Sequence, residues 1–183
     1  EIKIKAEETA QESLSLGLAI STCTLPGKEL EFSVGSPELG LGIHGEPGLE
    51  KVAFKGGKES VLMVLSRLFA ETQADEEYAI IINNLGAVTP LEMSIIANEV
   101  LTSRYKDQIK LVIGPALLMT SLNMYGFSFS LLKLTEENTK MLCEPVGPSA
   151  WPEVVAPKEP QVFDIDYLQL RKKFEPSSNP QVQ

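Results

Sequence analysis

The chain of 183 residues has a mass of 20.0 kDa, and its 43% hydrophobic and 22% charged residues are typical of one globular domain rather than a disordered chain. Its 25 acidic and 16 basic residues give a net charge of −9, which argues against a nucleic-acid partner or an anionic membrane surface, since both need clustered cations. The uncharged stretch 111–132 is interrupted by glycine, proline, serine and asparagine, so no membrane-spanning helix is predicted.

The sequence contains two cysteines, Cys23 and Cys143, which show no metal-ligand spacing, and a single histidine, His44, which cannot build a zinc site alone. We therefore expect no metal on this chain. The unpaired thiols, and the lack of a basic and apolar leader at the first residues, predict a reduced and cytoplasmic protein.

The pattern of apolar residues, glycines and prolines predicts helices mixed with strands. In chain order these are a helix over 3–16 that ends at Gly17, a strand over 17–24, short strands over 31–34 and 38–43, a helix over 58–70, a strand over 78–83, a helix over 89–105, and strands over 109–114 and 126–134. This order predicts an α/β fold, a two-layer mixed β-sheet with helices 58–70 and 89–105 packed on one face.

Both of these helices have an apolar stripe that can pack on a sheet. Helix 58–70 places Val61, Leu65 and Leu68 on one face. Helix 89–105 begins with a capping box that has proline at its first position, Thr89-Pro90-Leu91-Glu92. The residues that this helix is expected to bury are Leu91, Ile95, Ile96 and Val100.

The composition changes near the end of the chain. Seven of the 12 prolines but only one of the 13 glycines lie in 144–183. This predicts a domain over 1–151, with Trp151 at its border, and a proline-rich arm or linker over 152–183. We expect 25–31 and 152–183 to contact another lobe, a second copy of the chain or the rest of a larger enzyme.

The densest glycine cluster covers residues 40–48, where Gly40, Gly42 and Gly45 satisfy the spacing G-x-G-x-x-G. A dinucleotide site needs the third glycine inside a helix that opens there, and Pro47-Gly48 would stop such a helix. The spacing therefore does not favour a dinucleotide site.

What remains in this cluster is His44, which has small residues on both sides. Because glycine has no Cβ, a ligand can approach the imidazole closely, and a neutral ring nitrogen can donate a hydrogen bond, transfer a proton or attack a carbonyl. Glu46 is the nearest candidate in sequence to orient the other ring nitrogen. The alternative is that His44 only fills a tight turn.

The segment 83–86, Asn-Asn-Leu-Gly, lies between a predicted strand and a predicted helix. Ligand contacts are common at this place in α/β proteins. Turn chemistry is the favoured interpretation, because asparagine tolerates left-handed backbone and glycine adopts it freely.

Four motifs in order resemble the K domain of the dihydroxyacetone kinases. They are C-T-L-P-G at 23–27, E-L-G-L-G-I-H-G-E-P-G at 38–48, I-N-N-L-G at 82–86, and T-S-L-N-M at 120–124, continued by G-F-S at 126–128 and L-L-K at 131–133. The resemblance covers about residues 1–151 and implies the C-terminal, substrate-tethering lobe of that domain.

The resemblance implies a role for His44, which occupies the histidine position of the G-I-H-G-E-P-G motif. In this family that histidine holds dihydroxyacetone, or a related short ketose or aldose, covalently as a hemiaminal while its terminal hydroxyl is phosphorylated. The resemblance also implies a homodimer. A first lobe would supply acid/base residues, and a helical L domain would carry ATP and Mg²⁺, so we expect this chain to bind no cofactor and to be an incomplete kinase by itself.

The sequence leaves two other functions open within this family. The chain is alternatively a non-catalytic relative that senses a ketose or binds a partner protein, or a part of a bifunctional kinase and FMN cyclase. An unaltered glycine loop around His44 favours the substrate-tethering function.

Overall fold

The structure is a computed structural model that describes residues 2–24, 27, 36–44 and 46–158. In this part of the chain, no helix combines the length and the apolar character needed to cross a membrane. Cys23 and Cys143 are not joined in a disulfide.

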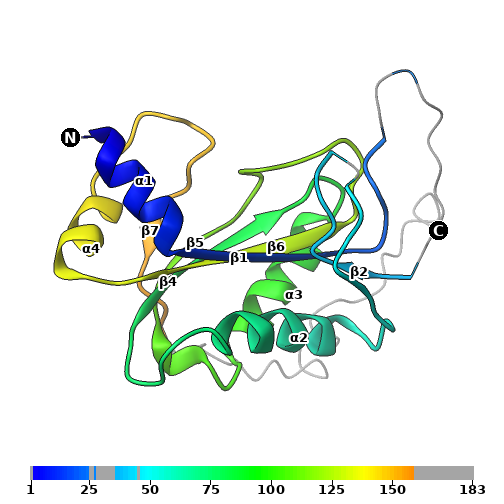
Figure 1. The fold of residues 1–183 in the computed structure, drawn as a ribbon, viewed down its shortest axis with the longest axis horizontal. Coiled ribbons are helices and arrows are strands. Elements are labelled where there is room, and N and C mark those ends of the chain that lie inside the picture. Colours follow the sequence, from blue (N-terminus) through cyan, green and yellow to red (C-terminus); the bar gives the residue numbers. More distant parts are fainter. Residues whose placement is uncertain (1, 25–26, 28–35, 45, 159–183) are drawn as a thin grey trace, which may run out of the picture.

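A mixed sheet of seven strands forms the centre of the molecule, in the order β3-β2-β1-β6-β4-β5-β7 (Figure 1). The strands are β1 (Ser13–Ala19), β2 (Glu38–Leu39), β3 (Glu50–Lys51), β4 (Tyr78–Asn84), β5 (Ile109–Ala116), β6 (Gly126–Lys133) and β7 (Val154–Val155). Only β4 and β5 are parallel, and the other neighbours are antiparallel.

Two helices, α2 (Gly57–Phe69) and α3 (Pro90–Leu101), cover one face of this sheet (Figure 1). The shorter helices α1 (Ile2–Glu12) and α4 (Glu136–Leu142) lie where β1 begins and β6 ends. An ion pair between Lys5 and Glu137 links them. A single turn of 3-10 helix, Lys106–Gln108, leads into β5. The predicted α/β fold, a two-layer mixed sheet with both main helices on one face, is confirmed.

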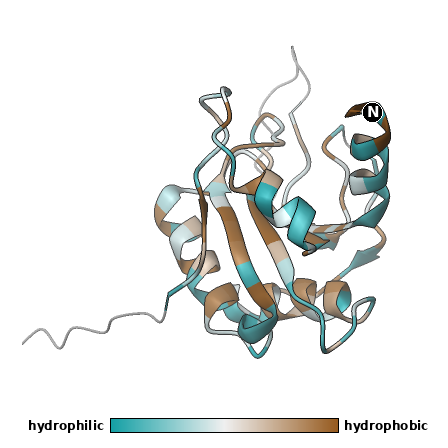
Figure 2. Ribbon diagram, turned by 90° about the vertical axis from the view of Figure 1, so that its left-hand side faces the viewer, coloured by the Kyte–Doolittle hydropathy of each residue, from teal (hydrophilic) through white to brown (hydrophobic). Residues whose placement is uncertain are grey.

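The core lies between the helices and the sheet. The predicted stripe of α2 is confirmed, because Val61, Leu65 and Leu68 are all buried. They face Ile80 and Phe129, which are also fully buried. Figure 2 shows the result as central strands that are mostly hydrophobic, while α1, which buries no residue, is largely hydrophilic.

The predicted stripe of α3 is only partly right. The capping box at Thr89 is present, and Ile96 and Val100 are buried. Leu91 and Ile95, however, are 73% and 52% exposed. Met93 takes their place in the core, so the buried positions follow the spacing i, i+3, i+7 of one helix face and Leu91 and Ile95 lie beside it.

The start of the chain differs from the prediction of a helix over 3–16 and a strand over 17–24. The helix ends at Glu12, and β1 begins at Ser13 and pairs with β6 along its whole length. Gly17 lies in the middle of this strand, where an added Cβ would stand 3.1 Å from the Cβ of Ser128. Helix propensity over 13–16 is overridden because pairing with a central strand satisfies the backbone there.

Several other element boundaries differ from those predicted from the sequence. The strand predicted over 38–43 stops at Leu39, because Gly40 has a φ of 70° and turns the chain into a loop. The predicted strand over 31–34 lies outside the described residues, as do most of 25–31 and everything from residue 159. The expected arm begins with β7, which pairs with β5, so its first residues belong to the sheet.

Candidate functional site

The loop that carries His44 connects β2 to β3 and is fixed by hydrogen bonds at both ends. At one end the Gly40 N–H donates to the carbonyl of Gly17 at 2.8 Å, which attaches the loop to β1. At the other end the N–H of Leu49 donates to the carbonyl of Leu39 at 2.7 Å. The left-handed Gly40 is also packed against the Leu49 side chain, 2.9 Å from where a Cβ would be. The loop is therefore positioned by the sheet edge.

The His44 side chain is 80% exposed, and its Nδ1 lies 3.2 Å from Oε1 of Glu46. The other carboxylate oxygen of Glu46 accepts a hydrogen bond from the His44 backbone N–H at 3.0 Å. The pKa of the Glu46 carboxyl is held below its ordinary value, first by its own backbone N–H and then by that of His44. The predicted contact between Glu46 and one ring nitrogen is confirmed, and Nε2 has no hydrogen-bond partner among the described residues.

A pocket of about 730 Å³ lies beside this loop, on the sheet face opposite α2 and α3. Side chains alternate between the two faces of a strand, and on this face β1 and β6 present small and polar groups. These are Ser15, Gly17, Ser128 and Ser130, and the neighbouring β4 adds Ile81 and Asn83. The walls are Leu41, Gly42 and Ile43 from the His44 loop, Leu118 and Met119 from the loop after β5, and Trp151. Gly42 and Ile43, which directly precede His44, therefore line the pocket, whereas His44 itself is not one of its lining residues.

Asn83 and Asn84, at the end of β4, are 4% and 7% exposed. Asn83 accepts hydrogen bonds from the backbone N–H groups of Leu118 and Met119 and donates to the Met119 carbonyl and to Ser128. Asn84 bonds across the turn to Gly86 and Val88. These amides hold the turn and the wall of the pocket, which agrees with the favoured interpretation of this segment as turn chemistry.

Gly86 is required by this turn. Its φ is 143°, and an added Cβ would stand 2.1 Å from the backbone carbonyl oxygen of Ser121. That carbonyl belongs to the loop 117–125, whose Ser121 N–H donates to the carbonyl of Leu85. The turn after β4 and the loop after β5 are thus held together by backbone contact.

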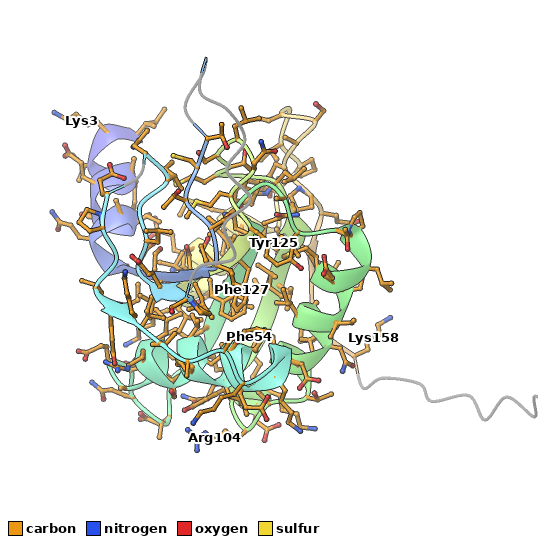
Figure 3. The ribbon with its side chains drawn as sticks, turned by 90° about the vertical axis from the view of Figure 1, so that its right-hand side faces the viewer. Lys3, Phe54, Arg104, Tyr125, Phe127 and Lys158 are labelled. Atoms are coloured by element: carbon orange, nitrogen blue, oxygen red, sulfur yellow. The ribbon has the colours of Figure 1, made fainter. Side chains whose placement is uncertain are left out.

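A smaller apolar pocket of about 300 Å³ lies on the helical side of the sheet, between α2, α3 and the start of β6. Phe54, from the stretch before α2, and Tyr125 and Phe127, from around the start of β6, line it (Figure 3). The Tyr125 hydroxyl donates to the carboxylate of Glu92, and this bond and burial raise the pKa of Tyr125 to about 12. The pocket is separated from His44 by the sheet.

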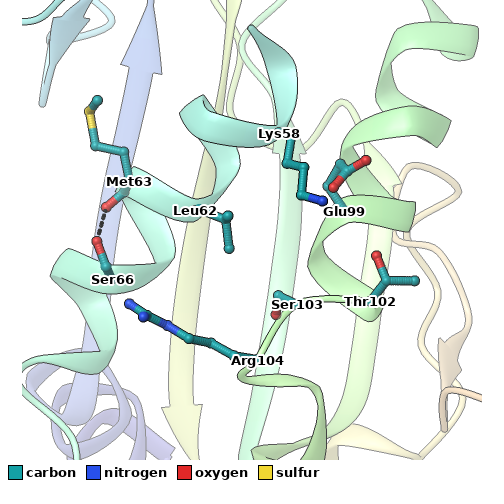
Figure 4. Close-up of a pocket in the computed structure, with 8 residues that line it drawn as sticks. All are labelled: Lys58, Leu62, Met63, Ser66, Glu99, Thr102, Ser103 and Arg104. Atoms are coloured by element: carbon teal, nitrogen blue, oxygen red, sulfur yellow. Dashed lines mark hydrogen bonds between the residues drawn. The ribbon is translucent and has the colours of Figure 1, made fainter. Parts of the chain in front are cut away.

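A third pocket, of about 400 Å³, lies on the outer side of the helical layer between α2 and α3 (Figure 4). Lys58, Glu99 and Arg104 surround it with mixed charge. Two of its hydroxyl groups donate to their own helices, Ser66 to the carbonyl of Met63 at 2.9 Å and Thr102 to that of Asn98 at 2.7 Å, and the Ser103 hydroxyl accepts from the Tyr105 N–H. Among the described residues, no histidine lines either of the two helical pockets.

The residues that the structure describes hold no group of three or more His, Cys, Asp and Glu side chains that could bind a metal ion. Sequence reasoning missed the serine-lined pocket, although its signal was present. The alternation in G-F-S-F-S-L-L-K is typical of a strand with one solvated face, and the polar side of that alternation, Ser128 and Ser130, is part of the pocket. The contribution of Trp151 had no local signal, because it depends on where the chain returns after α4.

Comparison with known proteins agrees with this fold. A family model described as the Dak1 domain matches residues 1–150. The dihydroxyacetone kinase of Citrobacter freundii is 37% identical over 179 residues, which cover 96% of this chain and 32% of that protein. A crystal structure of the dihydroxyacetone kinase from C. freundii, in complex with AMP-PNP and Mg²⁺, superposes with a TM-score of 0.83 at 36% identity and covers 99% of this chain and 34% of the crystallised one.

Two further relatives have names that describe other functions. The human triokinase/FMN cyclase is 32% identical over 185 residues, covering 88% of this chain and 32% of that protein. The structure of a dihydroxyacetone kinase operon co-activator, DhaQ, has a TM-score of 0.68 at 27% identity and covers 84% of this chain and 50% of the other. The chain thus spans about a third of the length of the curated relatives it matches.

Proposed function

The chain belongs to the Dak1 domain family, and we propose that it is the substrate-binding lobe of a dihydroxyacetone kinase. The proposed substrate is dihydroxyacetone or a related short ketose or aldose, which His44 binds covalently as a hemiaminal. The proposed reaction of the whole enzyme is ATP-dependent transfer of a phosphoryl group to the terminal hydroxyl of the bound sugar.

One observation carries this proposal: one ring nitrogen of His44 contacts Glu46, the other has no hydrogen-bond partner among the described residues, and the loop that carries His44 lines a pocket whose floor includes three serines. A histidine that only filled the turn would have its ring packed against the loop, whereas this side chain is 80% exposed. The pocket volume of about 730 Å³ leaves room for a three- or four-carbon sugar together with water.

The covalent step that we propose is an addition to the carbonyl carbon. The Nε2 lone pair forms the new carbon–nitrogen bond, and the π electron pair of the carbonyl moves to its oxygen, which takes a proton from water. The Nδ1 proton leaves the ring to water, so the addition is neutral overall. The bond fixes the sugar and its terminal hydroxyl in one orientation, which is the main requirement for phosphoryl transfer. Glycerol, which has no carbonyl, cannot be captured in this way.

The other parts of the reaction are proposed to lie outside this chain. ATP and Mg²⁺ would be held by an L domain, and acid/base groups would come from the first lobe of the K domain. A homodimer of the K domain is part of the same proposal. The short share of each relative that this chain covers supports such a division of labour.

A regulatory function is the second candidate, because a co-activator with this fold is among the similar structures. In that case the chain would capture a ketose and signal its presence without phosphorylating it. The unaltered His44 loop fits both candidates, so phosphoryl transfer is the property that separates them. In the full protein to which this lobe belongs, ³¹P NMR with dihydroxyacetone, ATP and Mg²⁺ should reveal a phosphate ester if the protein is a kinase. Ketose capture without any ester would assign the regulatory function.

Covalent capture itself is tested on this chain with carbonyl-labelled [2-¹³C]dihydroxyacetone and ¹⁵N-labelled histidine. We expect a tetrahedral ¹³C resonance that is split by the bonded ¹⁵N, which the hydrate of free dihydroxyacetone cannot show. His44→Ala should abolish the split signal, and labelled glycerol should never produce it. A wild-type chain without ¹³C–¹⁵N coupling would contradict the proposal.

A further inference from the structure

We propose that Glu46 and Gly42 act together as positioning residues that hold the proton of the His44 ring on Nδ1, so that the lone pair lies on Nε2. What the Nε2 lone pair then does rests on the proposed function. The position of the proton is a property of the loop alone and is measurable without any ketose.

The first step of the argument is the chemistry of the Glu46 carboxylate. Both of its oxygens face His44, Oε2 accepting from the backbone N–H at 3.0 Å and Oε1 lying 3.2 Å from Nδ1. Backbone N–H groups favour the charged form and lower the pKa of this carboxyl, so it is ionised near neutral pH and can only accept. A contact between an acceptor and Nδ1 requires a proton on Nδ1, and a neutral imidazole then has its lone pair on Nε2.

The second step concerns how the carboxylate is kept in place. A Cβ built on Gly42 would stand 2.1 Å from Oε2 of Glu46 and 2.9 Å from its Cδ, so the carboxylate occupies the space that any side chain at Gly42 would take. The N–H of Gly42 also donates to the backbone carbonyl of Glu46 at 3.1 Å, which closes the turn. Gly42 is thus needed for the carboxylate to reach His44.

The backbone at Gly42 does not itself demand glycine. Its φ lies outside the left-handed range, unlike that of Gly40, so alanine fits the backbone. The Glu46 atoms that an alanine would displace are the carboxylate and also the Cβ, which lies 2.8 Å from the added methyl group, so the turn itself has to shift slightly. Gly42→Ala should therefore push the Glu46 carboxylate away from His44 while leaving the charge of Glu46 unchanged.

The third step is the consequence for addition to a carbonyl. As Nε2 forms its bond, the ring gains positive charge until the Nδ1 proton leaves. An ionised carboxylate against Nδ1–H stabilises that charge, as the carboxylate does in catalytic carboxylate–histidine pairs, and the Nδ1 proton then passes to water. Glu46 therefore acts through His44 and needs no contact with the sugar.

The test uses ¹⁵N NMR of this chain, in which His44 is the single histidine, so its two ring signals need no assignment among residues. The spectrum is recorded without ketose at alkaline pH, where an imidazole is neutral. We expect wild type to show a protonated-type Nδ1 and an unprotonated-type Nε2, with that tautomer favoured by about tenfold. Glu46→Ala and Gly42→Ala should each shift the two signals toward averaged values.

The matched controls are Gly147→Ala, where an added Cβ meets nothing within 4 Å, and Glu50→Gln, which removes the acid that pairs with Arg67. Both should keep the wild-type tautomer. A backbone amide spectrum checks that every variant is folded. Wild type with its proton on Nε2, or a folded Glu46→Ala with an unchanged spectrum, would overturn the inference.

Ketose capture then separates this inference from the proposed function. When the ¹³C–¹⁵N adduct experiment is repeated, Glu46→Ala and Gly42→Ala should capture dihydroxyacetone about tenfold more slowly than wild type, while Gly147→Ala matches it. If wild type has the expected tautomer but forms no adduct, the positioning role of Glu46 stands and the proposed function fails. If adduct formation is equally fast in Glu46→Ala, the positioning role fails and the proposed function stands.

Discussion

Asn83 and His44 are polar residues of two segments that line the same pocket, the end of β4 and the loop after β2, but the protein uses them in opposite ways. Asn83 is 4% exposed, and both ends of its amide are bonded inside the protein. The His44 side chain is 80% exposed, and within the part of the chain that the structure describes only one of its ring nitrogens has a hydrogen-bond partner. The contrast teaches that a polar group with all of its bonding capacity used stabilises the fold, whereas one with a free nitrogen remains available for chemistry.

The two residues also differ in what would follow their loss. Removing the Asn83 amide leaves the N–H groups of Leu118 and Met119 without their acceptor. Removing the His44 ring leaves only the Glu46 carboxylate, which is exposed and retains its backbone donors. The fold should therefore depend on Asn83 and hardly on His44.

Asn83→Ala should have the largest effect on stability. Backbone donors that lose a partner away from bulk water cost about 1–3 kcal/mol each, so we expect the free energy of unfolding to fall by about 2–3 kcal/mol. Urea unfolding followed by circular dichroism measures this. Asn98→Ala, on the exposed side of α3, is the matched control and should stay within about 0.5 kcal/mol of wild type. If Asn83→Ala and Asn98→Ala are equally stable, the buried amide of Asn83 does not stabilise the fold in the way described.

Glu92 is intermediate between the buried Asn83 and the exposed His44, because it is partly buried and fixed at the first turn of α3. Hydrogen bonds from the Tyr125 hydroxyl, and then from Thr89, hold the pKa of its carboxyl below the ordinary value. A carboxyl whose pKa is lower in the folded than in the unfolded state stabilises the protein above its unfolded pKa and loses this effect as the pH falls through the folded pKa.

Glu92→Gln should therefore lower the melting temperature at pH 7 by the equivalent of about 1 kcal/mol, the usual value of a helix cap. The difference from wild type should shrink as the pH falls below about 4. Thermal melts between pH 3 and pH 7 measure this convergence. Glu71→Gln, at an exposed position, should follow the wild-type curve throughout. A gap between Glu92→Gln and wild type that stays constant with pH would contradict the role given to the ionised carboxyl.

Of the three variants, His44→Ala should have the smallest effect on stability, in contrast to Asn83→Ala. An exposed loop side chain with one partner contributes little, so we expect the free energy of unfolding to stay within about 0.5 kcal/mol of wild type. Urea unfolding of the two proteins side by side provides the measurement. A loss of more than about 2 kcal/mol would identify His44 as a turn-filling residue and place it with Asn83.

Much of the fold could be predicted because the responsible interactions are local. The capping box at Thr89 and the proline after it determine where α3 begins. The β-branched run of β4 and the alternation of β6 determine two strands whose residues Ile80 and Phe129 are fully buried. The contact between His44 and Glu46 was predictable for the same reason, since two residues that flank one position of a turn are necessarily close.

The remaining features depended on residues that are far apart in the sequence. Ser13–Leu16 has helical propensity but lies in β1, because antiparallel pairing with β6 satisfies its backbone. Leu91 and Ile95 are exposed because the rotation of α3 against the sheet places Met93 and Ile96 in the core instead. Local propensity does not contain this information, since burial is set by the partner surface.

The sequence by itself determined the family, the helical and strand core, and the one histidine with its orienting acid. Only the tertiary structure decided that Asn83 is a buried structural amide and that serines from β1 and β6 form the floor of a pocket beside the His44 loop. The physical reason is that a capping box or a turn is formed by neighbours in sequence. This pocket, by contrast, exists because residues more than 100 positions apart in the chain, such as Ser15 and Ser130, come together in one sheet.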